Sequence, residues 1–428
     1  MSGSAIIDDL KARGLVHDTT DEAALRTRLD EGPITLYHGI DPSASSLHLG
    51  NLIGILVLRR FQDHGHLPIA LVGGSTGMVG DPGGRSEERN LLDTATLEGN
   101  VEGIRSQVER LVGVSAGKGV QLVNNFDWTK DVGILDFLRD VGKHATVNQM
   151  VAKESVRTRM NSEQGISFTE FSYMLLQAFD FWWLHTHMAC DMQIGGSDQW
   201  GNITAGIDLI RRREAKGVYG LSWPLITKAD GTKFGKSASG ALWLDTEQTM
   251  PYEFHQYFLR SDDRDVERFL LQLTLLPVEQ IAEIMADHRG EPEARRAQQV
   301  LADVVTGFVH GDAAVRQSKL AAAALFGGGV LDAESLEALR GIVPESEITT
   351  DLLTGVEPVV EVLVASGVAS SRGDARRTVK QGGIRINGEK VEAADATVSP
   401  VDGRYVLLQK GKKQRHLVVI SALSLIHI

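Results

Sequence analysis

Three short apolar segments in the first half of the chain each end in a turn and lead into a helical pattern. They span residues 34–40, 68–73 and 120–124. Strands that alternate with helices predict a parallel sheet covered by helices, with ligands bound at the carboxyl ends of the strands. Three polar or glycine-containing groups fall at those ends: Tyr37-His38-Gly39, Gly73-Gly74-Ser75 and Asn124-Asn125.

The rest of the chain has a different pattern. Residues 251–339 lack strand signals and predict helices, and residues 384–391 alternate as a hairpin with Asn387-Gly388 at its turn. We therefore predict an α/β fold of three parts: a Rossmann-like parallel-sheet domain (1–245), an α-helical domain (246–348) and a small α+β domain (349–420). The nearly uncharged residues 421–428 are predicted to be an unstructured tail, whose removal leaves activity and melting temperature intact.

Composition bounds the class of protein. A chain of 428 residues suits two or three domains, and no apolar run approaches a membrane span. The first residues lack the pattern of a signal peptide, and a single cysteine, Cys190, excludes an intrachain disulfide, so we expect a cytoplasmic protein. His185, His187 and Cys190 are three potential metal ligands in a predicted loop without a fourth, and we predict no protein metal site.

The net charge of −12 is unevenly distributed. Residues 372–415 carry eleven Lys and Arg against five Asp and Glu, so the rest of the chain is strongly acidic. This contrast indicates a separate basic module that binds nucleic acid, although a basic solvated surface would give the same count.

Two distant segments carry groups suited to a polyphosphate. Leu47-His48-Leu49-Gly50-Asn51 precedes an apolar helical run, where free N–H groups favour anions, and Lys233-Phe234-Gly235-Lys236-Ser237 supplies two cations. A P-loop is excluded because Asp230 stands where the first glycine is required. A hydrolase elbow at Ser197 is excluded because Gln199 replaces its second glycine.

In this order the two segments resemble the HIGH and KMSKS signatures of class I aminoacyl-tRNA synthetases. Residues 73–82, 168–180 and 193–202 look like the bacterial tyrosyl-tRNA synthetase family, and residues 371–377 with 382–391 are similar to an S4 RNA-binding domain. The resemblance runs from about Asp8 to Ile420. It implies an enzyme that activates L-tyrosine with ATP, accompanied by Mg²⁺ and without a tightly bound cofactor, and transfers it to the 3′ end of tRNA(Tyr).

The resemblance also implies roles for individual residues. His48 would donate to the phosphates, Lys233 and Lys236 would close over pyrophosphate, and Arg85 and Arg89 would lie on another phosphate-contacting segment. The residues implied to bind tyrosine are Tyr37, Asp81, Tyr173, Gln177, Asp180 and Gln199. Those implied to bind ATP are Gly39, Asp41, Ser43, His48, Gly50, Asn51, Gly196, Asp198 and Lys236. Those expected to bind RNA are Arg372, Arg376, Arg377, Lys380 and Arg385.

One helix face supports the tyrosine pocket independently. Tyr173, Gln177 and Asp180 are spaced four and then three apart, which places them on one side of a helix. Such a polar stripe usually faces solvent, but its neighbours here are apolar and aromatic, so we predict a cavity lining. The family resemblance implies that Tyr37 and Asp180 meet the substrate hydroxyl.

The chain departs from the family pattern at several positions. Asn51 replaces the second His of HIGH, Phe234-Gly235 replaces Met-Ser, His38 stands where many relatives carry Cys, and Gly54 offers no side chain to ATP. Either Asn124 or Asn125 could face the site.

The family is dimeric, with tRNA reaching across both subunits, so we expect a homodimer, with residues 246–348 binding the anticodon. Two other functions are compatible with the pattern: a tryptophanyl enzyme, which would need neither Asp180 nor the S4-like module, and a noncatalytic RNA-binding protein on a synthetase scaffold.

Overall fold

The computed structural model describes residues 3–82, 92–113, 119–161, 165–232, 234–237, 240–327 and 331–421. The chain forms two compact units. The first comprises Met1–Thr249 and Tyr257–Val305, and the second comprises Met250–Gln256 and Thr306–Ile428. Among the described residues, no helix has the length and apolar character needed to cross a membrane.

The first unit contains a six-stranded sheet in the order β1-β6-β5-β2-β3-β4. All neighbouring strands are parallel except the short edge pair β1 and β6. The strands are β1 (Asp18–Thr19), β2 (Thr35–Ile40), β3 (Leu67–Val72), β4 (Gln121–Asn124), β5 (Cys190–Gly196) and β6 (Tyr219–Trp223). Strand β2 pairs with β3 on one side and with β5 on the other, so the strand order reverses at this point of the sheet. In sheets of this kind a crevice forms beyond the carboxyl ends of the two strands at the reversal, here β2 and β5.

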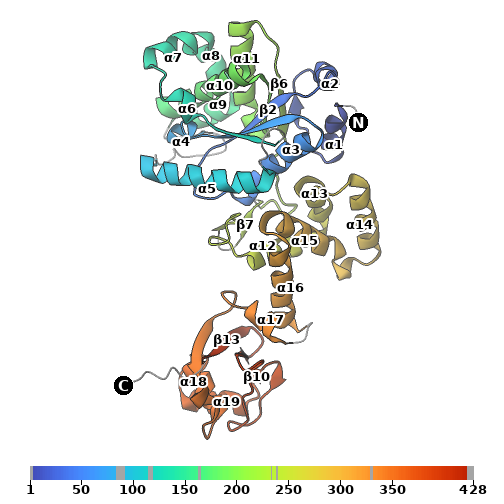
Figure 1. Ribbon diagram of the computed structural model, residues 1–428, viewed down its shortest axis with the longest axis vertical. Helices are drawn as coiled ribbons and strands as arrows, with labels where there is room; N and C mark the ends of the chain where they lie inside the picture. The colour runs from blue at the N-terminus through green and yellow to red at the C-terminus, as the bar shows by residue number, and fades with distance from the viewer. Residues whose placement is uncertain are drawn as a thin grey trace. The chain divides into compact units, whose positions relative to one another are not determined.

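Helices cover both faces of this sheet (Figure 1). Helices α3 and α5 pack together on β3, and α10 and α11 pack together on β5. Nine of the twelve residues of α3 are buried, because the helix is apolar apart from Arg59, Arg60, Gln62 and Asp63. The helices of this part are α1 (Ala5–Ala12), α2 (Glu22–Asp30), α3 (Leu52–Asp63), α4 (Thr76–Val79), α5 (Thr94–Val112), α6 (Phe126–Thr129), α7 (Ile134–Asp140), α8 (Val147–Ala152), α9 (Glu154–Met160), α10 (Phe168–Met188) and α11 (Trp200–Glu214).

Helices follow as the sequence pattern predicts, after a short pair of strands. The elements are β7 (Lys236–Ser237), β8 (Gly240–Ala241), α12 (Pro251–Leu259), α13 (Asp263–Leu273), α14 (Val278–Gly290), α15 (Arg296–His310), α16 (Asp312–Phe326) and α17 (Ala333–Glu337). Helix α13 begins at a conventional cap, in which the Asp262 side chain accepts the backbone N–H of Arg264.

The second unit contains a five-stranded sheet in the order β11-β10-β12-β13-β9. One face, with Leu407 and Leu417, packs on α16 and α17. The opposite face, with Leu408 and Val418, packs on α18 and α19. The elements are β9 (Glu345–Thr349), α18 (Pro358–Ala365), α19 (Arg372–Lys380), β10 (Ile384–Ile386), β11 (Glu389–Lys390), β12 (Tyr405–Lys410) and β13 (Gln414–Ser421).

The predicted fold class is confirmed: a parallel-strand α/β region, a helical region and a small C-terminal sheet. Asn387 and Gly388 both adopt positive φ angles at the predicted hairpin turn. Residues 345–348, assigned to the helical region, instead form most of β9, which pairs in parallel with β13. Ser421, assigned to the tail, pairs with Thr349 as the last residue of β13, whereas residues 422–428 lie outside the described part.

The segment around Cys190 also differs from the prediction. His185 and His187 lie in the last turns of α10 and Cys190 begins β5, so the three residues do not share a loop. The His185 ring contacts the Cys190 carbonyl and the Asp191 carboxylate through Nδ1. Within the described ranges, no three His, Cys, Asp or Glu side chains are grouped to hold a metal ion.

Candidate functional site

A pocket of about 380 Å³ lies at the carboxyl ends of β2 and β5. This is the position that the strand order of the sheet favours for a ligand. Its lining includes fourteen of the predicted site residues: Tyr37, Gly39, Asp41, Ser43, His48, Gly50, Asn51, Asp81, Tyr173, Gln177, Asp180, Gly196, Asp198 and Gln199.

Asp180 lies at the buried end of this pocket. Its carboxylate accepts hydrogen bonds from Asn125 Nδ2 and Trp128 Nε1, both at 2.9 Å. Trp128 is itself held by stacking on Trp183, with ring centroids 4.2 Å apart. Burial raises the pKa of Asp180 to about 7, although these two donors oppose the shift.

The Tyr37 hydroxyl is a second polar group at this end. Tyr37 is 1% exposed, packs its ring against Phe181, and its hydroxyl has no hydrogen-bond partner among the described residues. Burial, together with the negative charge of Asp180, raises the pKa of Tyr37 well above its ordinary value. A buried hydroxyl without a partner is costly, so this atom suits a polar group of a ligand.

A chain of hydrogen bonds leads from Asp180 to the middle of the pocket. Asn125 Nδ2 also donates to Thr76 Oγ1 at 3.1 Å, and Thr76 donates to Asp41 Oδ1 at 2.7 Å. Asp41 Oδ2 accepts from the Tyr173 hydroxyl at 2.8 Å. Burial and the neighbouring Asp41 raise the pKa of Tyr173 well above 10.0, so Tyr173 is a neutral donor. These contacts fix the position of Asp41 before any ligand arrives.

A second network holds the polar groups on the β5 side. Gln199 Nε2 donates to Asp81 Oδ2 at 2.6 Å. Asn202 Nδ2 donates to both Gln177 Oε1 and Gln199 Oε1, at 3.0 and 3.2 Å. The result is a group of oxygen acceptors around Asp81, next to Asp198, whose pKa is raised by burial and by the charge of Asp81. Such a group favours a cationic ligand group.

The first signature segment caps a helix. His48 Nδ1 accepts the Gly50 N–H at 3.0 Å, and the Asn51 side chain accepts the His48 N–H at 3.0 Å. A neutral imidazole that accepts at Nδ1 carries its proton on Nε2, which makes Nε2 the donor. The Asn51 side chain thus holds the His48 backbone at the start of this turn.

The second signature segment runs beside the first. The Leu49 N–H donates to the Leu242 carbonyl, and the Leu242 N–H donates to the Gly235 carbonyl. Gly235 also donates its N–H to the Tyr257 hydroxyl at 2.9 Å, and the Phe234 ring lies between Tyr257 and Phe269. Lys236 is exposed on β7 and does not line the pocket.

His38 and Gly54 face each other in the pocket wall. A Cβ atom on Gly54 would lie 2.2 Å from His38 Nε2, so the imidazole occupies the space that a side chain at position 54 would need. The ring packs edge-on against Trp223 and contacts the Ile194 carbonyl through Nδ1. Burial lowers the pKa of His38 to about 4, so the ring is neutral near pH 7.

Three predicted phosphate-binding residues, Arg85, Arg89 and Lys233, lie outside the described residues. Of the two asparagines between which the sequence could not decide, Asn125 reaches the site through its hydrogen bond to Asp180, whereas Asn124 Oδ1 accepts the N–H groups of Gly74 and Phe126.

Sequence reasoning missed three residues that hold the site together: Thr76, Trp128 and Asn202. The only sequence feature that could have indicated Thr76 is its position just after the glycine turn that follows β3.

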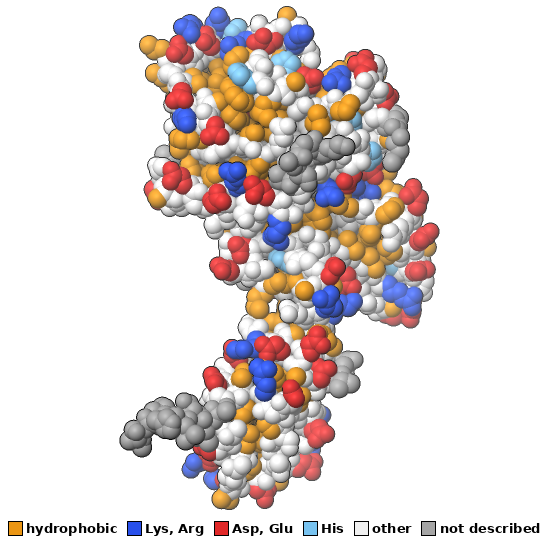
Figure 2. Space-filling view, in the orientation of Figure 1, with side chains coloured by type: hydrophobic (Ala, Val, Ile, Leu, Met, Phe, Trp, Pro, Cys, Tyr) orange, Lys and Arg blue, Asp and Glu red, His pale blue; other side chains and the backbone are white. Residues whose placement is uncertain are grey.

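The predicted RNA-binding residues do not form one surface. Arg372, Arg376, Arg377 and Lys380 lie on α19, whereas Arg385 belongs to the sheet face that packs on α16. Arg372 pairs with Glu361 of α18, and Arg376 pairs with Glu357, the residue before α18. In Figure 2 the visible face of the second unit carries Lys and Arg interspersed with Asp and Glu.

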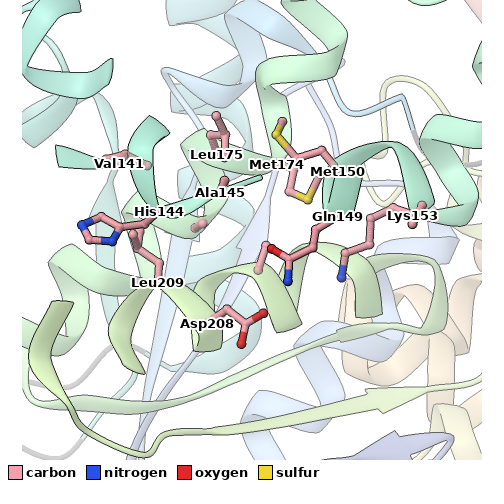
Figure 3. A pocket seen from close by; sticks show the side chains of 13 residues that line it. Val141, His144, Ala145, Gln149, Met150, Lys153, Met174, Leu175, Asp208 and Leu209 are labelled. Carbon is pink, nitrogen blue, oxygen red and sulfur yellow. The ribbon is translucent and has the colours of Figure 1, made fainter. Parts of the chain in front are cut away.

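A separate pocket of about 270 Å³ lies on the other side of α10 (Figure 3). Met150 and Met174 pack together in its wall, and Lys153 and Asp208 lie at its polar edge. Lys153 Nζ donates to Thr204 Oγ1 at 2.7 Å. Helix α10 thus separates this pocket from Tyr173, Gln177 and Asp180.

Comparison with protein families gives two matches. Residues 29–327 match the family of class I tRNA synthetases (W and Y), and residues 336–418 match the tyrosine–tRNA ligase SYY-like C-terminal domain.

Individual relatives agree with the family matches. The chain is 50% identical over 423 residues to a tyrosine–tRNA ligase of Opitutus terrae, with 97% of this chain and 99% of the relative covered. It is 46% identical over 418 residues to that of Geobacillus stearothermophilus, with 96% and 99% covered.

Solved structures show the same fold. A C-terminally truncated mitochondrial tyrosyl-tRNA synthetase of Aspergillus nidulans matches with a TM-score of 0.69 and 30% identity, over 75% of this chain and 94% of that chain. A tryptophanyl-tRNA synthetase of Encephalitozoon cuniculi has a TM-score of 0.54 at 14% identity, over 74% of this chain and 91% of that one, which shows a shared fold alone.

Proposed function

This chain belongs to the tyrosine–tRNA ligases of the class I tRNA synthetases, and we propose that the pocket at the ends of β2 and β5 joins L-tyrosine to ATP and delivers the tyrosyl group to tRNA(Tyr). The observation that carries this assignment is the buried end of the pocket. There the Tyr37 hydroxyl has no hydrogen-bond partner among the described residues. The negative charge of Asp180 is near enough to contribute to the raised pKa of Tyr37, after the larger effect of burial. A phenolic hydroxyl can donate to one of these groups and accept from the other.

The remaining polar groups suit the rest of the amino acid. The oxygen acceptors around Asp81, Gln177 and Gln199 favour the ammonium group. Tyr173 adds its hydroxyl dipole, held by Asp41. With the hydroxyl at one end and the ammonium at the other, the substrate carboxylate would face the opening where ATP binds.

The reaction has two steps, the first at the α-phosphorus of ATP and the second at the carbonyl carbon of the tyrosyl group. The tyrosine carboxylate oxygen attacks the α-phosphorus of ATP, the bond from that phosphorus to the bridging oxygen breaks, and pyrophosphate leaves. The terminal ribose hydroxyl of the tRNA then attacks the tyrosyl carbonyl, loses its proton and displaces AMP. Neither step needs a nucleophile from the protein, so catalysis depends on alignment and charge stabilisation.

The phosphate-facing groups would supply that stabilisation. His48 Nε2–H would donate to phosphate oxygens, and Gly50, in the short turn Leu49–Asn51 just before α3, allows their close approach. Gly39, Ser43, Gly196 and Asp198 would contact the nucleoside. Lys236, with Lys233, Arg85 and Arg89, would neutralise the leaving pyrophosphate, and Mg²⁺ would arrive bound to ATP.

The C-terminal part is assigned to tRNA. Residues 246–348 would contact the anticodon arm and residues 349–420 would hold the tRNA with basic side chains. The acceptor end would then reach the pocket of the catalytic part. We assign the reaction to the cytoplasm.

A homodimer is also proposed. Several large apolar side chains of the first unit are exposed, which is typical of a face that associates: Ile134 (70%), Leu135 (77%), Val147 (62%) and Phe168 (75%). Light scattering at micromolar concentration should give twice the chain mass, and a monomer would refute the assignment.

Aminoacylation tests the function directly. The full-length protein, ATP, Mg²⁺ and labelled tyrosine should charge a bacterial tRNA(Tyr) transcript. A transcript lacking its terminal adenosine is the control and should accept nothing. Failure to charge, with a folded protein, would refute the proposal.

A further inference from the structure

Three aromatic rings are stacked between the surface of the first unit and the buried end of its pocket. The Trp128 and Trp183 rings are nearly parallel, at 9°, with centroids 4.2 Å apart. The exposed His187 ring stacks on Trp183 in the same way, at 8° and 4.3 Å. Two rings that are parallel to Trp183 at such distances cannot share one face of it, so Trp183 is the middle ring of the stack.

The spacing of residues on α10 brings this stack to the site. Asp180, Trp183 and His187 are three and then four residues apart, so they lie along one side of the helix. Trp128 comes from α6, and its indole N–H donates to Asp180 Oδ1 at 2.9 Å. The stack therefore connects the last turns of α10 with the carboxylate assigned to the substrate hydroxyl.

A cavity of about 250 Å³ lies beside the two tryptophans. Both indole rings line it, together with apolar side chains such as Leu122 and Met188. Close packing holds a side chain in one orientation only where neighbours surround it, and a cavity gives a ring space to turn. The stack with Trp183 is thus the contact that fixes the plane of the Trp128 indole.

The orientation of this indole matters because of how Asp180 is bonded. Asn125 Nδ2 donates to one carboxylate oxygen and Trp128 Nε1 donates to the other, both at 2.9 Å. Each donor opposes the effect of burial, which raises the pKa of Asp180. Both donors therefore hold the carboxylate in place and favour its charged form, which is the stronger acceptor for a phenolic hydroxyl.

We infer that Trp183 is a positioning residue for the tyrosine substrate, and that it acts through the hydrogen bond from Trp128 to Asp180. Trp183 lies outside the lining of the pocket. His187 covers the outer face of the Trp183 ring and supports the same plane. The inference rests on the proposed function, because it takes Asp180 as the partner of the substrate hydroxyl.

Steady-state exchange of pyrophosphate into ATP by the full-length protein tests this role. Trp183→Phe keeps a ring that can stack on Trp128, whereas Trp183→Met fills the space without one. Trp183→Met should raise the KM for tyrosine about tenfold, as expected for a weakened hydrogen bond to a charged group, and change the KM for ATP less than about twofold. Trp183→Phe should stay within about threefold of the unmodified protein. Equal KM values for the two variants would overturn the inference.

A double-variant cycle separates positioning from a general loss of packing. Trp128→Phe removes the indole N–H that reaches Asp180 but keeps a ring beside position 183. In this background Trp183→Met should change the KM for tyrosine less than about twofold, because the bond through which it acts is already absent. A further rise of about tenfold would show that Trp183 acts by another route, and the inference would be wrong.

Trp182→Met is the matched control, at the neighbouring position of α10. The Trp182 indole nitrogen donates to Glu214, and its ring contacts Phe179 and Arg213. This variant should change the KM for tyrosine less than about twofold, because it leaves the stack intact. A rise equal to that of Trp183→Met would show that the loss of any tryptophan from this helix has the same effect, which also overturns the inference.

Melting curves establish which variants fold. If neither Trp183 variant folds, His187→Ala decides, because it removes the outer ring at an exposed position. The KM for tyrosine should then rise about threefold, and an unchanged KM would refute the role of the stack. Absence of tyrosine-dependent exchange in the unmodified protein would refute the proposed function itself. Exchange by the unmodified protein, with folded variants that all match it, would refute only the role of Trp183.

Discussion

Asn125 Nδ2 donates to Asp180 Oδ2 at 2.9 Å at the buried end of the pocket, where Asn125 has no exposed surface and Asp180 is 3% exposed. The same amide nitrogen donates to Thr76, and Thr76 donates to Asp41. One buried asparagine therefore links the carboxylate assigned to the substrate hydroxyl with the carboxylate in the middle of the pocket.

The first prediction concerns Asp180 and substrate choice. Asp180→Ala removes the assigned partner of the substrate hydroxyl and leaves Asn125 and Trp128 with unpaired donors, each costing about 1–3 kcal/mol. Tyrosine activation should fall by at least about a hundredfold in kcat/KM. Steady-state exchange of pyrophosphate into ATP at several tyrosine concentrations measures kcat/KM. Near-normal values would contradict the assignment of Asp180 to the substrate hydroxyl. Asp208→Ala is the matched control, because Asp208 belongs to α11 and lines the separate pocket on the other side of α10.

The second prediction is a pH effect on stability. Burial raises the pKa of Asp180 from 3.8 to about 7, so the folded state retains a proton that the unfolded state releases between these values. Stability from this group is complete below about pH 4 and is lost as the pH rises to about 7, with a slope of about 1.4 kcal/mol per pH unit.

Asp180→Asn removes this titration. The melting temperature of the unmodified protein should therefore fall relative to that of the variant between about pH 5 and pH 7, and the difference should level off above that range. Calorimetry of both proteins in the same buffers checks it. A difference that stays constant across the range would show that Asp180 is ionised throughout.

The third prediction pairs His38 with Gly54. Gly54→Ala places a Cβ atom within 2.2 Å of His38 Nε2 and should destabilise the protein by about 1–3 kcal/mol. Adding His38→Ala removes the opposing ring and should recover part of that loss. Gly99→Ala is the control, because a Cβ there meets nothing within 4 Å, and it should be neutral or stabilising by up to about 1 kcal/mol. Denaturant unfolding measures the unmodified protein, the single variants His38→Ala and Gly54→Ala, the double variant and the Gly99→Ala control, and additive effects of the two changes at 38 and 54 would contradict the contact.

The fourth prediction concerns the loop that carries Lys236. Tyr257→Phe removes the hydroxyl that accepts the Gly235 N–H but keeps the ring against Phe234. The maximal rate of pyrophosphate exchange should fall by about tenfold, while the KM for tyrosine changes little, since Tyr257 does not line the pocket. An unchanged rate, or an effect on tyrosine KM alone, would show that this bond does not position the loop.

Local sequence signals predicted much of the fold because they depend on neighbours in the chain. The apolar strand segments, the helical run after Asn51 and the Asn387-Gly388 turn all follow from periodicity or from backbone preference. Strand β9 was missed because its sequence, Glu345–Thr349, is mostly polar and its pairing partner β13 lies some seventy residues later. Parallel pairing at that separation leaves no local signal.

The site was predictable in its residues but not in its connections. The stripe of Tyr173, Gln177 and Asp180 on α10 indicated a cavity lining, and all three residues line the pocket. The bonds from Asn125 and Trp128 to Asp180 depend on how α6 packs against α10, which no spacing within either segment reveals. For the same reason, the sequence could not show that Arg385 lies on the opposite sheet face from the α19 arginines.

The most direct test of the central claim is amino-acid-dependent exchange of pyrophosphate into ATP with Mg²⁺, with tyrosine, phenylalanine and tryptophan as separate substrates. We predict rapid exchange with tyrosine and little with the other two, because only tyrosine presents a hydroxyl to Tyr37 and Asp180. Equal exchange with phenylalanine, exchange with tryptophan alone, or none with any of them in a folded sample would contradict this account.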